Sequence, residues 1–483
     1  MAAAGPLRRI VVAGDGPVGL LAAAALKRSL PPCDVVVISA PTGAAAFADR
    51  SATALPFTCR LHERLGIADT ALLRRAAASH RLITRYFGWG GSDSHGVAAY
   101  GAELDPAMAG AFARSWGGGQ RNVSADTAPG SIAEVLADAG RYAFPLADDG
   151  GAAGAVDHAM RWNTGAYRQI LSEAAAQLGI AGLAGPVVGC KLDGQGGLRS
   201  VATAADGDIT ADLFVDCTGP DAKLLAALRE HAVIDWADRL PVRTVYLAEP
   251  GPPVLALEDR MTLLPQGWLS ELAGRDGLQT TLAASRSLDP QEVRDALGAP
   301  AAEAIPIGPA RAKASWLGNV VALGDAAARF EPIGGYPLDL AHRQLALLLE
   351  LLPSLAFAPA ERAEYNRRAA LMADAVRDTI AVHYAAPAAM AVFGSQGRSA
   401  QLDRTIDQYT RRGRMPFREE APLAGQEFCA LLVALGFAPG TTTLAAARPA
   451  DEAAVAAAFA VKARSVLVRT PPYAEWLAGQ LSA

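Results

Sequence analysis

A glycine-rich turn between an apolar strand and a helix constrains the fold of this chain more than any other feature. Residues 9–13 are typical of a short buried strand, residues 14–19 match G-x-G-x-x-G, and residues 20–30 have helical spacing. In such a turn the first glycine permits a sharp bend, the second lets the backbone approach a pyrophosphate, and the third lets the helix pack closely on the strand. The helix N-terminus offers unpaired N–H groups to phosphate oxygens. The turn predicts a nucleotide-binding βαβ unit, and a glycine-rich turn without a ligand is the alternative. We expect nucleotide contacts from Gly14, Asp15, Gly16, Pro17, Val18 and Gly19.

The second strand of this unit, residues 35–38, is a continuous Val/Ile run that ends at Ser39. Continuous apolar runs of this length indicate a parallel sheet that is covered on both faces. Many dinucleotide-binding folds have a carboxylate near this position, where it binds the ribose hydroxyls. Because Ser39 offers a single hydrogen bond there, we expect a weaker hold on an adenosine ribose.

Two further turns of small residues follow apolar strands. Residues 319–323 lead into Gly324 and Asp325, and residues 212–217 lead into Thr218 and Gly219. The Asp325 carboxylate suits a ribityl hydroxyl, although an aspartate that only caps a helix is the alternative. Three such turns favour FAD over NAD as the cofactor. No second strand–GxGxxG–helix unit is found, so we expect a separate flavin reductase to supply reduced FAD.

Composition narrows the class of protein. The 483 residues carry a formal net charge of −5 without a long basic cluster, which argues against a nucleic-acid partner. No charge-free apolar run reaches about 20 residues, so we expect no membrane span. The five cysteines are scattered and form no C-x-x-C pair. They predict neither a disulfide framework nor a zinc ribbon, and they favour the cytoplasm. Because the cysteines form no zinc-binding pattern, we expect an enzyme without a metal.

In order along the chain, several segments resemble the flavin-dependent tryptophan halogenase family, within the flavin monooxygenases of p-hydroxybenzoate-hydroxylase-like fold. Besides the G-x-G-x-x-G unit, these segments are residues 61–67, 212–219, 235–241, 324–326, 365–368 and 378–384. The resemblance implies an α/β fold with a Rossmann-like FAD-binding domain, an inserted β-sheet on the substrate side and a mostly helical C-terminal part. We expect residues 1–340 to form the discontinuous FAD-binding domain and residues 341–483 the helical region. The resemblance also implies FAD contacts at Ala52, Val188 and Pro332.

In this family, reduced FAD and O₂ form a hydroperoxide that chloride attacks, and hypochlorous acid travels along a tunnel to a lysine beside the aromatic substrate. The resemblance implies a need for that lysine, a glutamate, a chloride-binding loop and a W-x-W-x-I-P segment. The chemistry belongs to the cofactor, while the protein supplies placement and excludes side reactions.

The chain departs from the family at each of these positions. Arg81 stands at the lysine position, and arginine stays protonated in proteins, so it is a poor carrier of chlorine. Residues 268–273 keep only the first tryptophan of W-x-W-x-I-P, and residues 334–337 read Gly-Gly-Tyr-Pro where the family has Glu-Ser-Thr-Gly. The G-E-A-T-x-P loop becomes residues 51–56, without its carboxylate. We therefore expect a halogenase-like fold that does not chlorinate.

The first hypothesis for function is oxygenation of a small indole- or phenol-like substrate. Its predicted catalytic residues are Arg81, Glu331 and Ser270, and its predicted substrate contacts are His80, Tyr336 and Phe428. Each of these also has a structural interpretation: a paired arginine, a core histidine or a core aromatic. Two alternatives stay open, namely an atypical halogenase that uses Arg81 and a flavin-fold partner protein without turnover. The sequence leaves the oligomeric state open, with a homodimer as one option.

Overall fold

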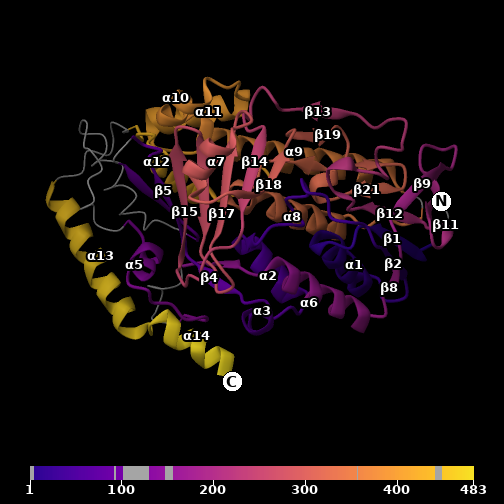
Figure 1. The fold of residues 1–483 in the computed structure, drawn as a ribbon, viewed down its shortest axis with the longest axis horizontal. Helices are drawn as coiled ribbons and strands as arrows, with labels where there is room; N and C mark the ends of the chain where they lie inside the picture. The colour runs from indigo at the N-terminus through magenta and orange to yellow at the C-terminus, as the bar shows by residue number, and fades with distance from the viewer. Residues whose placement is uncertain are drawn as a thin grey trace.

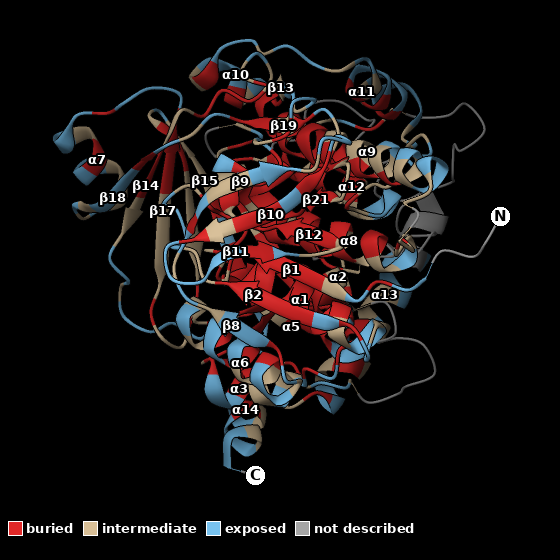
Figure 2. Cartoon of the chain, turned by 90° about the vertical axis from the view of Figure 1, so that its right-hand side faces the viewer, coloured by how far each residue is buried: buried red, intermediate tan, exposed pale blue. Residues whose placement is uncertain are grey.

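A mainly parallel sheet surrounds the N-terminal strand of the chain (Figure 1). The computed structural model describes residues 5–91, 94–101, 130–146, 156–355, 357–440 and 449–482. The strand order is β20-β21-β12-β1-β2-β8, with β20 alone antiparallel. These strands are β1 (Arg9–Ala13), β2 (Asp34–Ile38), β8 (Ala181–Leu183), β12 (Leu213–Asp216), β20 (Trp316–Leu317) and β21 (Val320–Ala322). Figure 2 shows β1, β2 and β12 largely buried, as the Val/Ile runs predict.

Helices cover this sheet and begin where the sequence predicts. α1 (Pro17–Ser29) starts immediately after Gly16, and proline is well suited to a first helical position because its missing N–H has no partner there. α1 packs against α6 (Thr164–Gln177) and α8 (Tyr336–Glu350). The helix expected at residues 20–30 is thus confirmed, with small shifts at its ends.

A second, mainly antiparallel sheet is inserted on the other side of the molecule. Its order is β18-β14-β17-β16-β15-β5-β6, and β15 and β5 form its parallel pair. α7 (Pro290–Leu297) packs on β17 and β18. The strands are β5 (Ile83–Phe87), β6 (His95–Ala99), β14 (Thr244–Ala248), β15 (Glu258–Leu264), β16 (Gly267–Leu272), β17 (Gln279–Ala284) and β18 (Ala301–Pro306). This sheet is the insertion that the resemblance implies.

Three small sheets join these layers, in the orders β3-β7-β4, β11-β10-β9 and β13-β19-β22. Their strands are β3 (Thr53–Ala54), β4 (Ser79–Arg81), β7 (Ala159–Arg161), β9 (Val187–Leu192), β10 (Leu198–Thr203), β11 (Gly207–Thr210), β13 (Val233–Asp235), β19 (Ala310–Ala312) and β22 (Ala328–Arg329). The alternating patterns of residues 198–204 and 209–216 are typical of one hairpin, and this prediction from the sequence is only partly right. β10 pairs with β11, whereas residues 213–216 leave the hairpin as β12 and pair with β1 and β21.

The C-terminal part is mostly helical, and the expected α/β fold class is confirmed. The remaining helices are α2 (Pro56–Arg64), α3 (Asp69–Arg75), α5 (Ile132–Asp138), α9 (Pro359–Tyr384), α10 (Pro387–Phe393), α11 (Ala400–Arg412), α12 (Gly425–Ala434), α13 (Pro449–Arg469) and α14 (Tyr473–Ser482), and the short 3₁₀ helices are η1 (Gly219–Asp221), η2 (Gly324–Ala326) and η3 (Ile333–Gly335). The boundary expected at residue 340 falls inside α8, and one core cluster extends from Leu7 to Leu477. The division into two domains stays a prediction. Gly/Ala-rich segments near residues 148–155 and 437–450 predict loops or boundaries, and residues 148–155 and 441–448 of these segments lie outside the described residues.

Within the described residues, no helix is both long enough and apolar enough for a bilayer crossing.

Candidate functional site

The three predicted turns lie next to one another at one edge of the parallel sheet. Gly14 follows β1, Thr218 follows β12 and Gly324 follows β21, and these three strands are neighbours. The carboxyl ends of parallel strands meet at one edge, which is where ligands bind in open α/β sheets. Gly14 has φ +117°, and a Cβ there would lie 2.2 Å from the carbonyl oxygen of Cys217. Only glycine therefore fits the bend after β1.

Asp325 offers a free acceptor to a ligand at this edge. Its carboxyl is 4% exposed, its Oδ2 accepts the Ala48 N–H at 2.8 Å, and its Oδ1 has no partner. Burial raises the pKa of Asp325 well above its usual value. An unpaired buried carboxyl oxygen costs free energy unless a ligand or water pairs with it. A ribityl hydroxyl would satisfy Oδ1, so this turn fits the FAD that the fold implies.

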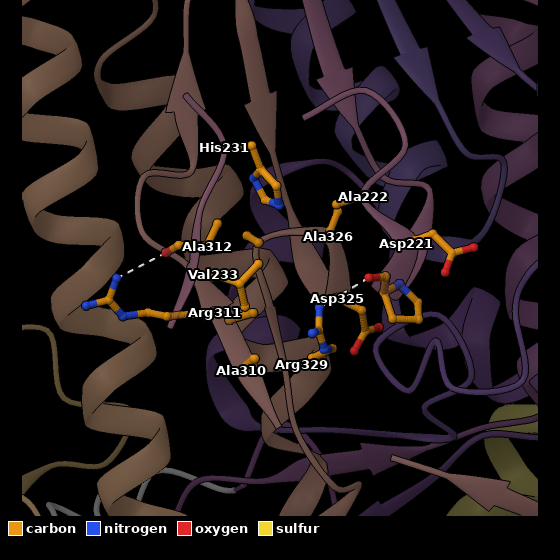
Figure 3. Close-up of a pocket in the computed structure, with 13 residues that line it drawn as sticks. Asp221, Ala222, His231, Val233, Ala310, Arg311, Ala312, Asp325, Ala326 and Arg329 are labelled. Carbon is orange, nitrogen blue, oxygen red and sulfur yellow. Dashed lines mark hydrogen bonds between the residues drawn. The ribbon is translucent and has the colours of Figure 1, made fainter. Parts of the chain in front are cut away.

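A pocket of about 220 Å³ reaches the same carboxyl (Figure 3). His231, Arg311 and Arg329 line it together with Asp325. Arg311 forms an ion pair with Asp374 at 3.0 Å, and the guanidinium of Arg329 donates to the Gly308 carbonyl oxygen at 2.7 Å. Both arginines are thus already paired, whereas Asp325 Oδ1 and His231 Nδ1 have no hydrogen-bond partner within the described residues.

The phosphate turn contains a carboxylate that sequence reasoning missed. Val18 N–H donates to Asp49 Oδ1 at 2.9 Å, and a Cβ on Gly16 would lie 2.4 Å from the Asp49 carboxyl carbon. Asp49 is 7% exposed, and burial raises its pKa to about 6. This carboxylate thus occupies the space that Gly16 leaves for a pyrophosphate, and it accepts the Val18 N–H that a phosphate would use. A dinucleotide would have to displace the Asp49 side chain. The sequence signal that could have identified it is the position of Asp49, an acidic residue in an alanine-rich segment before β3.

Ser39 and Asp15, both predicted cofactor contacts, bind each other. Ser39 Oγ donates to Asp15 Oδ2 at 2.7 Å, and the Ala40 N–H donates to Asp15 Oδ1 at 3.1 Å. Arg168 forms an ion pair with the same carboxylate at 2.5 Å. The Ser39 hydroxyl is therefore occupied by Asp15 in this arrangement.

Arg81 is held in a buried ion pair. It lies on β4 and is 3% exposed, and its guanidinium pairs with Asp259 of β15, whose side chain is 4% exposed. Arg81 Nη2 also donates to the Ala54 carbonyl oxygen at 2.9 Å, and its Cζ lies 5.2 Å from the Tyr100 ring centroid. No sequence pattern indicates Asp259, which is 178 residues away from Arg81. Arg81 is committed to protein groups at the position where the resemblance places the lysine.

No buried lysine replaces Arg81 at this position. The chain's lysines are Lys27, Lys191, Lys223, Lys313 and Lys462. All of them fall within the described residues, and none is buried.

Glu331 forms a second buried polar group, with Tyr384 and Trp268. Tyr384 Oη donates to Glu331 Oε1 at 2.5 Å and accepts the Trp268 indole N–H at 3.0 Å. Glu331 is fully buried, and its Oε2 has no partner. Burial raises the pKa of Glu331 to about 7, against the lowering effect of the Tyr384 hydrogen bond. A carboxyl with such a pKa and a free oxygen is suited to general acid–base work at neutral pH.

Four other predicted site residues lie next to β3, at the start of α8 and on β16. Ala52 precedes β3, and a Cβ on Gly335 would lie 2.9 Å from Thr53 Cγ2, so the loop that contains Pro332 packs against β3. Tyr336 is buried at the start of α8, and Ser270 follows Trp268 on β16.

Three predicted contacts lie on other elements. Val188 is on β9 in a separate sheet and is 63% exposed, and Phe428 is buried on α12 beneath the Arg418 guanidinium. His80 is buried on β4, where its ring lies against His158. The roles assigned to all of these site residues stay predictions.

Comparison with known proteins gives a consistent result. The sequence model of the family described as tryptophan halogenase matches residues 9–450. The tryptophan 7-halogenase RebH of Lentzea aerocolonigenes is 24% identical over 418 residues, which cover 79% of this chain and 76% of RebH. The 7-chloro-L-tryptophan 6-halogenase KtzR of Kutzneria sp. is 28% identical over 245 residues, 47% of this chain and 46% of KtzR, so that match spans about half of the relative. The fold is similar to that of BrvH, a flavin-dependent halogenase from Brevundimonas sp. BAL3, with a TM-score of 0.86 and 23% identity over 98% of this chain and 99% of BrvH.

Proposed function

Because the chain belongs to the tryptophan halogenase family, we propose that it is a flavin-dependent enzyme that oxygenates a small aromatic substrate. Proteins of this family use FAD that a separate flavin reductase reduces, and the three glycine turns with the free Asp325 Oδ1 are the groups that would hold it. When bound and reduced, FAD supplies the activation of O₂. The proposed compartment is the cytoplasm, which the free cysteines fit.

The observation that carries this proposal is the buried ion pair of Arg81 with Asp259. A side chain that carries chlorine as a chloramine needs a nitrogen that can lose its proton, and arginine keeps its proton. Asp259 and the Ala54 carbonyl oxygen further hold the guanidinium in place. No buried lysine substitutes for it. The buried ion pair of Arg81 and the lack of a buried lysine therefore support oxygenation over chlorination.

Glu331 is the proposed acid–base group. With a pKa of about 7, a large part of it is ionised at neutral pH, and its free Oε2 can take the proton of a phenol or indole as oxygen is added. Tyr384 donates to the other oxygen and so fixes the orientation of the carboxyl. Trp268 in turn holds the Tyr384 hydroxyl. Glu331 would contribute about 10²–10⁴-fold to the rate, which is typical of general acid–base catalysis.

Halide dependence of substrate consumption tests this proposal. The protein is supplied with FAD, a flavin reductase, NADH and O₂, and a panel of indoles and phenols is followed in chloride, in bromide and without halide. We expect equal consumption in all three media. Consumption that needs halide would contradict the proposal and favour the atypical halogenase, which family membership and the retained Trp268 support.

A flavin-fold partner protein without turnover is the second candidate, and Asp49 is the observation that favours it. Its carboxylate takes the Val18 N–H and fills the space above Gly16. The absorbance spectrum of the purified protein after incubation with FAD decides this point. A colourless protein after gel filtration, together with no substrate consumption, would favour the second candidate.

A further inference from the structure

Two buried histidines and one aspartate converge in a cluster that includes His80, the neighbour of Arg81 in the chain. His80 lies on β4, His158 immediately precedes β7, and Asp69 is the first residue of α3. One ligand atom from each residue lies within 4.8 Å of those of the other two, and His158 Nε2 is 3.5 Å from Asp69 Oδ2. His80 is fully buried, His158 is 5% exposed, and the Asp69 side chain is 19% exposed. Three elements therefore bring one carboxylate and two imidazoles together inside the molecule.

The free nitrogens of the two histidines have no hydrogen-bond partner. Neither His80 Nε2 nor His158 Nε2 has one among the described residues, although both atoms are buried. Buried polar atoms are nearly always paired, so two ring nitrogens without a hydrogen bond, one of them 3.5 Å from the Asp69 carboxylate, need an explanation. A cation between them would pair with both nitrogens and with the Asp69 carboxylate.

The other nitrogen of each histidine is held by a tyrosine. His80 Nδ1 lies 3.1 Å from Tyr473 Oη, and His158 Nδ1 lies 3.0 Å from Tyr142 Oη. When each Nδ1–H donates to its tyrosine, the lone pair of Nε2 is left for a ligand, which is the tautomer that a metal-binding histidine requires. The cluster thus has oriented ligands as well as ligands of the right type.

Aromatic rings cover the cluster. The rings of Tyr142, Phe144 and Trp476 lie with their centroids 5.2, 6.2 and 5.4 Å from that of His80. Figure 1 shows α3, β4 and α14 in the same part of the molecule, and α14 packs on α3. An ion here would join α3, β4 and β7 directly, and α14 through Tyr473.

We propose that Asp69, His80 and His158 form a binding site for a divalent transition-metal ion of the zinc class. Two imidazoles and one carboxylate with bonds of about 2.0–2.2 Å are a known zinc ligand set, and water would take the fourth position. The 3.5 Å between His158 and Asp69 already approaches the ligand spacing of a tetrahedral site, which is about 3.3 Å for such bonds. The sequence predicts no metal because the three ligands lie far apart in the chain and form no spacing motif. The proposal is independent of the proposed function.

Metal analysis of the purified full-length chain tests this site. The protein is stripped with a chelator, reconstituted with Zn²⁺, desalted and measured by plasma mass spectrometry, and a second sample is reconstituted with Co²⁺. We expect about one metal ion per chain, and visible Co²⁺ bands of a four-coordinate nitrogen and oxygen site. An unmetallated wild-type protein after reconstitution would overturn the proposal.

Variants then assign the ligands. Asp69→Asn and His158→Gln should each reduce bound metal to below about a tenth of the wild-type amount. Tyr473→Phe should weaken metal binding about 10–100-fold, as is typical when a partner of a metal-binding histidine is lost. His342→Gln is the matched control, because His342 is also buried and its Nε2 is also unpaired, but it lies outside the cluster. Full metal content in Asp69→Asn and His158→Gln, or equal loss in His342→Gln, would overturn the assignment.

Discussion

Breaking the ion pair of Arg81 should destabilise the protein strongly. Asp259→Asn removes the negative charge and leaves the guanidinium at 3% exposure without an ionic partner. Removing one partner of a buried pair typically costs about 3–5 kcal/mol, because an uncompensated charge stays buried. Replacing both partners by apolar residues of similar volume is often neutral or stabilising. We therefore expect a cost of about 3–5 kcal/mol for Asp259→Asn and a much smaller one for Arg81→Met combined with Asp259→Leu.

Urea unfolding followed by circular dichroism measures these differences in the free energy of unfolding. Asp407→Asn serves as the control, because it breaks an exposed pair with Arg411 and should cost less than about 1 kcal/mol. A double-mutant cycle over Arg81 and Asp259 should give a coupling of at least about 2 kcal/mol. If Asp259→Asn costs no more than Asp407→Asn, Arg81 is not held by this carboxylate, and the structural argument against its role in chlorination fails.

Three further predictions concern the cofactor edge and Glu331. Burial raises the pKa of Glu331 from 4.5 to about 7, so the folded protein holds this proton more tightly than the unfolded chain does. The stabilisation from this bound proton is therefore fully present below about pH 4.5, and about 3 kcal/mol of it is lost as the pH rises to about 7. Glu331→Gln should flatten this pH dependence of the free energy of unfolding in urea titrations. The same substitution should abolish the matching limb of the pH–rate profile. Asp49→Asn should tighten FAD binding by about 1–2 kcal/mol, roughly fivefold to thirtyfold in Kd, because the α1 N-terminus loses a competing charge. Flavin fluorescence titrations should show this gain in affinity at pH 7.5 but much less of it at pH 5, because Asp49, with a pKa of about 6, is already protonated there. An unchanged Kd at pH 7.5, or an equal gain in the exposed control Asp34→Asn, would count against competition between Asp49 and FAD. NADH alone should leave the absorbance of bound FAD unchanged, whereas added flavin reductase should bleach it, and rapid bleaching by NADH alone would contradict the need for a partner.

The sequence predicted the parts of the fold that depend on local signals. The strand, glycine turn and helix of residues 9–29 are recognisable because the Val/Ile run, the three glycines and Pro17 act within a few residues. The separation of β11 from β12 could not be predicted in this way. Residues 213–216 pair with β1, about 200 positions earlier, and with β21, about 100 positions later.

The candidate site shows the same division between local and distant information. Gly14 and Gly324 are identifiable because a left-handed backbone conformation after a strand needs glycine. Asp259 and Asp49 were missed because their roles arise from the packing of distant segments against Arg81 and Gly16. The cluster of Asp69, His80 and His158 was missed for the same reason.

The most direct test of the central claim is the mass of the product formed under ¹⁸O₂ with saturating bromide. The protein is given FAD, a flavin reductase, NADH and the aromatic substrate that it consumes fastest. With Arg81 paired to Asp259, the account predicts a product that contains one ¹⁸O atom and no bromine. A product that carries bromine and no ¹⁸O would contradict it.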